Sequence, residues 1–176
     1  MKLNSGSSYK ILEYAAQREK ETRDFYIECL EKATIPGTRR LIEGLVADEK
    51  RHYNIVMKLL DEAKLGGDAS EVKTFATEDA QIRITSAFPH EMADANFAAE
   101  SATVGAMLKK ALENEKESFD NYSKAAQDTE ELEVKAIYQY LAAEENKHYD
   151  IISNIVAYLD APGKWLYQEE NLIFRL

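Results

Sequence analysis

Two copies of a Glu-x-x-His motif, 96 residues apart, limit what this chain can fold into. The first copy is Glu49-x-x-His52 and the second is Glu145-x-x-His148. Each lies in a run with helical rather than strand periodicity, and on a helix residues i and i+3 emerge on the same face. The carboxylate and the imidazole of one motif can therefore bind one ion together.

The same offset relates a second pair of segments. Residues 19–26 align with residues 115–122, with Glu, Lys, Glu, Asp and Tyr at matching places. In both halves, 30 residues separate the first glutamate of this segment, Glu19 or Glu115, from the glutamate of the Glu-x-x-His motif. The chain is therefore predicted to be a duplicated helical hairpin.

Length and composition favour one all-α domain. A chain of 176 residues is long enough for one sizeable core, and two domains would be cramped. Hydrophobic residues make up 45% and charged residues 31%, with only seven Gly and three Pro. This balance suits long amphipathic helices better than a sheet protein rich in turns. We therefore expect a single domain over residues 1–176.

Turn signals divide this domain into two hairpins, a crossover and a tail. Hairpin 1 is expected at about residues 8–64, the crossover at about 65–101, hairpin 2 at about 102–160 and the C-terminal tail at 161–176. The helices are expected at about residues 8–33, 39–64, 103–127 and 130–159, with a breaker at 34–38 and a further short helix near 91–100. The result is a four-helix bundle with one long crossover.

Six side chains near mid-helix are the candidate metal ligands. They are four glutamates and two histidines: Glu19, Glu49, His52, Glu115, Glu145 and His148. Six ligands can hold two ions, and four carboxylates offset the charge of two divalent cations. Imidazole suits iron, whereas tetrahedral zinc would leave too many oxygens unused. The alternative is a bundle that has lost its metal, which would bury these groups at a high cost in free energy.

Four further residues have competing interpretations. Tyr26 and Tyr122 lie two turns after Glu19 and Glu115, so they either hydrogen-bond ligand carboxylates or guard the site, or simply fill the core. Cys29 is the only cysteine, which excludes an internal disulfide and a four-cysteine module, and we expect a small core residue. His90, beside a proline, is expected in a loop.

Charge and hydropathy exclude several functions. The net charge is −10 and no basic run is present, which argues against binding to nucleic acid or to an anionic membrane surface. The first residues lack the apolar core of a signal peptide, and no stretch is apolar for long enough to span a bilayer. We therefore expect a cytoplasmic protein.

The repeated pattern resembles the rubrerythrin group of the ferritin-like superfamily. The residues that carry the resemblance recur in both halves: Glu19, Phe25, Tyr26, Leu45, Ala47, Asp48, Glu49 and His52, then Glu115, Tyr122, Leu141, Ala143, Glu144, Glu145 and His148. The resemblance covers nearly all of residues 8–160. It implies a ferritin-like four-helix bundle in which the six candidate ligands hold two iron ions per chain, with manganese as the alternative.

The resemblance also implies an activity and partners. Proteins of this group reduce hydrogen peroxide and often form homodimers. Classical members carry a C-terminal rubredoxin with four cysteines, whereas residues 161–176 here contain Trp165, Tyr167 and Phe174 but no cysteine, so a separate donor such as a rubredoxin is expected. Classical members also have an extra glutamate where this chain has Ser118. Without that glutamate, the site of this chain is expected to be more symmetric. The alternatives are a ferroxidase or iron-handling protein that uses dioxygen, and a non-catalytic metal-stabilised module.

Overall fold

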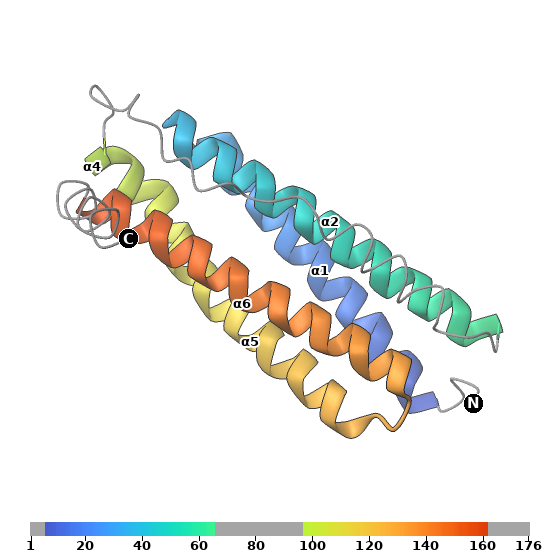
Figure 1. Ribbon diagram of the computed structural model, residues 1–176. Coiled ribbons are helices and arrows are strands. Elements are labelled where there is room, and N and C mark those ends of the chain that lie inside the picture. Colours follow the sequence, from blue (N-terminus) through green and yellow to red (C-terminus); the bar gives the residue numbers. More distant parts are fainter. Residues whose placement is uncertain (1–5, 66–96, 162–176) are drawn as a thin grey trace, which may run out of the picture.

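Four long helices form the described part of the chain. The computed structural model describes residues 6–65 and 97–161 (Figure 1). The helical elements are α1 (Gly6–Lys32), α2 (Pro36–Leu65), α4 (Phe97–Glu100), the π-helical turn η1 (Ser101–Gly105), α5 (Ala106–Asp128) and α6 (Leu132–Asp160). Elements α4, η1 and α5 follow one another without a break, so they act as one long helix. The predicted all-α bundle is confirmed, and the described residues contain no strand.

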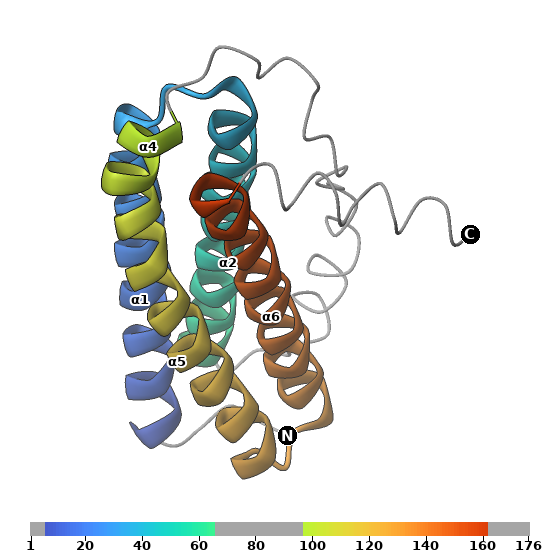
Figure 2. The ribbon, with the colours of Figure 1, turned by 90° about the vertical axis from the view of Figure 1, so that its left-hand side faces the viewer.

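The helices pack as two hairpins placed side by side. Helix α1 lies along α2, and α5 lies along α6 (Figures 1 and 2). The hairpins meet through α1 against α5 and through α2 against α6. Helices α1 and α5 are antiparallel, because Tyr26 lies near Glu115 while Tyr122 lies near Glu19. Helices α2 and α6 are antiparallel too, because both run opposite to their hairpin partners (Figure 1). The duplicated halves are therefore related by an approximate two-fold axis.

The turn of the first hairpin is shorter than predicted. We expected residues 34–38 to break the helix, but α2 already begins at Pro36. Proline suits the first turn of a helix because its φ is preset and the N–H that it lacks would have no helical partner. Arg39, the expected first residue, donates hydrogen bonds from Nη1 to the carbonyl oxygens of Leu30 and Ala33, both at 2.9 Å. These bonds give partners to carbonyl groups at the C-terminal end of α1, where helical N–H donors are lacking.

Other boundaries shift by a few residues. Helix α6 begins at Leu132 rather than near residue 130. The third long helix begins at Phe97 rather than near residue 103, and the π-helical turn η1 inserts an extra residue into it. Of the short helix expected near 91–100, only the end falls within the described residues. The path of the crossover, His90 and the tail aromatics Trp165, Tyr167 and Phe174 lie outside them.

Two apolar clusters fill the bundle on either side of a polar band. One contains Leu12, Leu59 and Leu141, and the other contains Ile42, Leu108 and Ile155. Cys29 is fully buried in the second cluster, as expected, and burial raises the pKa of its thiol to about 12. The six candidate ligands form the band between the clusters and are all at most 2% exposed.

A buried glutamate joins the third long helix to the first turn. Glu100 Oε2 accepts hydrogen bonds from Thr34 N at 2.8 Å, Thr34 Oγ1 at 2.5 Å and Ile35 N at 2.9 Å. These two N–H groups precede α2 and have no helical partner of their own. Glu100 therefore fastens the second hairpin to the turn of the first.

Replacing this glutamate is expected to destabilise the bundle. Glu100→Ala leaves the buried N–H of Ile35 without an acceptor, and an unsatisfied buried group costs about 1–3 kcal/mol, whereas the partly exposed donors of Thr34 can bond to water. The free energy of unfolding, measured by urea titration, should fall by at least that amount. Glu28→Ala on the exposed face of α1 is the matched control and should change it by less than about 0.5 kcal/mol. Equal losses in the two variants would show that the contacts of Glu100 contribute nothing beyond a surface charge.

Candidate metal centre

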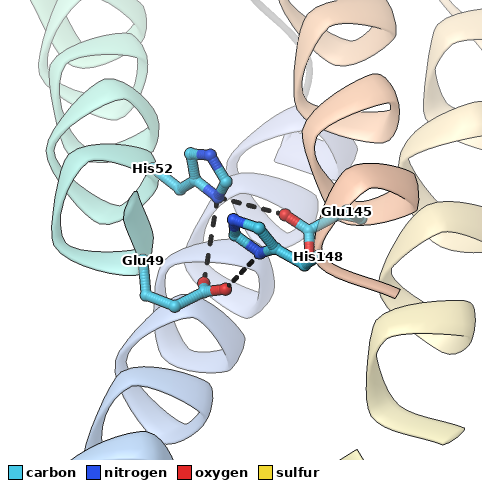
Figure 3. A group of neighbouring side chains, drawn as sticks. All are labelled: Glu49, His52, Glu145 and His148. Carbon is cyan, nitrogen blue, oxygen red and sulfur yellow. Dashed lines mark ion pairs between the residues drawn. The ribbon is translucent and has the colours of Figure 1, made fainter. Parts of the chain in front are cut away.

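The two Glu-x-x-His motifs meet at the centre of the bundle. Glu49 and His52 project from α2, and Glu145 and His148 project from α6 (Figure 3). One ligand atom from each of these four buried side chains lies within 4.8 Å of the others. The two imidazole rings stack at a centroid distance of 5.2 Å. The helical period places each pair on an inward face, and the antiparallel packing of α2 and α6 brings the two pairs together.

Each histidine lies closest to the glutamate of the other motif. His148 Nδ1 lies 2.8 Å from Glu49 Oε1, and His52 Nδ1 lies 3.1 Å from Glu145 Oε1. Within one motif, His52 Nδ1 and Glu49 Oε2 are 3.8 Å apart. The facing helix therefore supplies the carboxylate nearest to each histidine, and binding of one ion by one motif stays a prediction. Both Nδ1 atoms face the cluster.

The two lone glutamates complete the ring of candidate ligands. Glu19 Oε2 lies 3.5 Å from His52 Nδ1, and Glu115 Oε2 lies 3.6 Å from His148 Nδ1. They come from α1 and α5, so each of the four long helices contributes to the cluster. All six residues singled out from the sequence are thus brought together. That they bind metal remains a prediction.

Two tyrosines connect the hairpins at this cluster. The Tyr26 hydroxyl on α1 donates a hydrogen bond to Glu115 on α5, and the Tyr122 hydroxyl on α5 donates one to Glu19 on α1. Tyr26 also packs in one apolar cluster and Tyr122 in the other. Both interpretations weighed from the sequence therefore hold, since each ring fills core while its hydroxyl holds a carboxylate.

Burial and charge divide the four carboxyl groups into two kinds. Burial and the neighbouring carboxylates raise the pKa of Glu49 and Glu145 well above the usual value, despite the nearby His148. Burial acts in the same direction on Glu19 and Glu115, but the adjacent His52 and His148, together with the tyrosine hydroxyls, lower their pKa overall. The raised pKa extends protonation of Glu49 and Glu145 to higher pH than usual, and a bound cation would compete with those protons.

The buried polar atoms of this cluster fit cation binding. Several have no hydrogen-bond partner: both ring nitrogens of His52 and His148, both carboxylate oxygens of Glu49, and one oxygen each of Glu19, Glu115 and Glu145. Such groups are costly to bury unless something compensates them. Oxygen and imidazole donors together suit a divalent first-row metal ion such as ferrous iron or manganese.

Three charged residues beside the cluster had no role assigned from the sequence. Arg51 is 5% exposed and contacts Asp48 Oδ1 at 3.0 Å and Glu144 Oε2 at 2.8 Å. Burial opposes ionisation of Asp48, but contacts with His148 and Arg51 outweigh it and lower the pKa of the carboxyl. A sequence signal was present, because Asp48 and Glu144 occupy equivalent places in the repeat, directly before the candidate ligands.

Comparison with known proteins agrees with this arrangement. A family model described as Rubrerythrin matches residues 10–156, which is most of the chain. The chain belongs to the rubrerythrin family. No curated protein and no solved structure matches it significantly. Rubrerythrins are generally oxidoreductases that bind two iron ions, and the Glu and His cluster of this family member could hold metal ions.

A further feature of this rubrerythrin family member bears on the site. Ser118, at the place of the extra glutamate of classical members, is buried one turn after Glu115, and its counterpart in the first half, Thr22, is also buried. Both halves therefore present a small hydroxyl side chain there.

Within residues 6–65 and 97–161, no helix is long and apolar enough to cross a membrane.

Proposed function

We propose that this protein is a non-haem di-iron oxidoreductase that reduces hydrogen peroxide with electrons from a separate donor. The observation that carries the proposal is the convergence of two Glu-x-x-His motifs and two further glutamates in one buried cluster with uncompensated polar atoms. Two ferrous ions held there would supply one electron each, which breaks the O–O bond of peroxide and, with two protons, gives two waters. A donor such as a rubredoxin then restores both electrons.

The protein's own residues have three roles in this proposal. The six candidate ligands bind the ions: Glu19, Glu49, His52, Glu115, Glu145 and His148. Tyr26 and Tyr122 orient two of those carboxylates and can relay protons to them. The apolar clusters on both sides exclude bulk water, so electrostatic interactions at the cluster are stronger than in solvent. We propose further that the protein is a cytoplasmic homodimer, and manganese is the alternative to iron.

A second candidate function is oxidation and handling of iron with dioxygen as the oxidant. The specific observation in its favour is the symmetric pair Thr22 and Ser118, because the site then lacks the additional carboxylate of peroxide-reducing relatives. A protein that only binds metal for stability is the third alternative. These three differ in their reaction with oxidants.

Stopped-flow absorbance distinguishes the three functions. Protein loaded anaerobically with two ferrous ions per chain is mixed with hydrogen peroxide and, separately, with air-saturated buffer. We expect oxidation of the bound iron by peroxide to be much faster than oxidation by dioxygen. Preference for dioxygen would favour iron handling, and no oxidation by either would contradict both enzymatic functions. Sedimentation of the loaded protein then tests the dimer, since mineral storage needs a shell of many subunits.

A further inference from the structure

The candidate centre is nearly symmetric at the atoms that face the cluster. When each residue is exchanged for its counterpart in the other half of the repeat, the Tyr26–Glu115 hydrogen bond becomes the Tyr122–Glu19 hydrogen bond. The contacts of His148 with Glu49 and of His52 with Glu145 are related in the same way. If this symmetry extended to the surrounding residues, two bound ions would have equivalent environments.

The symmetry fails at the outer nitrogens of the two histidines. Asp48 Oδ2 lies 3.5 Å from His148 Nε2, within ion-pair distance although slightly longer than an ordinary hydrogen bond. The counterpart of Asp48 is Glu144, which makes no such contact with His52 among the described residues. Nε2 of both histidines is buried without a hydrogen bond, but only that of His148 has a carboxylate within ion-pair distance among the described residues. One imidazole therefore has a carboxylate behind it and the other does not.

Arg51 accounts for this difference. Its guanidinium lies 5% exposed between the hairpins, with Nη1 on Asp48 and Nη2 on Glu144. The planar fork of arginine can bridge two carboxylates in this way. Its counterpart, Lys147, carries a single ammonium group, is 65% exposed and contacts Glu144 of its own helix. Glu144 is therefore paired with two cations, and no ion pair joins it to His52 among the described residues.

A carboxylate behind a histidine affects its binding of a cation through the other nitrogen. It orients the ring, fixes which nitrogen carries the proton and makes the free nitrogen more basic. Both Nδ1 atoms face the cluster here, and Asp48 lies behind His148 alone. We propose that Asp48, held by Arg51, is a positioning residue for His148 with no counterpart at His52, so that the two ions bind with unequal affinity. This inference rests on the proposed metal site.

Stepwise metal binding tests the inequivalence. Metal-free protein is titrated anaerobically with ferrous ions and, separately, with manganous ions by isothermal titration calorimetry. The wild type should bind in two resolved steps. Asp48→Asn should weaken the tighter step by about 10–100-fold, the usual effect of removing a partner of a metal-binding histidine. Glu144→Gln is the matched control, because it also neutralises a buried carboxylate paired with Arg51 but leaves both steps in place.

The possible outcomes distinguish a failure of the proposed inequivalence from a failure of the proposed metal site. Two steps of equal affinity in the wild type, or equal losses in Asp48→Asn and Glu144→Gln, would overturn the inequivalence and leave the metal site intact. Absence of binding in the wild type would overturn both. Thermal unfolding of the metal-free variants checks that they fold. If Asp48→Asn does not fold, the wild-type titration alone decides.

Discussion

Glu49→Gln is expected to weaken the binding of ferrous ions at least about 100-fold and to abolish their rapid oxidation by peroxide. Glu49 is the carboxylate that approaches both histidines, with Oε1 2.8 Å from His148 Nδ1 and Oε2 3.8 Å from His52 Nδ1. Replacing a mere partner of a metal ligand already costs about 10–100-fold in affinity, so replacing a proposed ligand itself should cost more. The variant keeps the volume of the side chain, so packing is preserved.

The matched control for this prediction lies on the same helix. Glu43→Gln makes the same chemical change at a side chain that is 53% exposed, and it should leave both affinity and oxidation rate unchanged. Affinity is measured by anaerobic calorimetry and oxidation by stopped-flow absorbance. Undiminished iron binding in Glu49→Gln would show that the cluster is not the metal site, whatever the activity of the protein.

Arg51→Met removes a buried charge and is expected to cause a large fall in the free energy of unfolding. The substitution leaves Asp48 and Glu144, which are both buried, without their shared guanidinium. Removing one partner of a buried ion pair costs about 3–5 kcal/mol, because the remaining charge is left uncompensated. For a chain of this length, that loss lowers the melting temperature by roughly 6–20 °C.

This stability is best measured on metal-free protein, so that lost metal binding does not contribute. Lys50→Met, at the exposed preceding position, is the control and should change the free energy of unfolding by less than about 0.5 kcal/mol. Combining Arg51→Met with Glu144→Gln should recover part of the loss, since it removes the charge of one of the two carboxylates that the guanidinium bridged. A loss below about 1 kcal/mol in Arg51→Met would mean that water compensates the carboxylates.

The sequence alone was sufficient to find the six residues that form the cluster. Helix hydrogen bonds join residues four apart, so the direction of each side chain follows from local spacing. The repeat then indicated which distant residues belong together, because Glu19 and Glu49 are separated by the same interval as Glu115 and Glu145. The same reasoning placed Tyr26 and Tyr122 on the ligand face.

Some local features were misread because their signals have two meanings. Pro36 breaks a helix when it is internal but begins one at the first turn, and the sequence does not distinguish these positions. The hydrogen bond of Thr34 to Glu100 depends on a long-range contact between the hairpins. No local pattern announces such a contact.

What the sequence by itself determined was the helical class, the duplication and the inward face of each helix. The tertiary structure alone decided which side chains meet across that face: His148 with Glu49 rather than with its own motif, and Arg51 between Asp48 and Glu144. The physical reason is that helical spacing is set by bonds within one helix, whereas the register between helices is set by packing of their side chains. That register brings Arg51 against both Asp48 and Glu144, whereas its counterpart Lys147 contacts Glu144 of its own helix, so the two halves of the cluster differ.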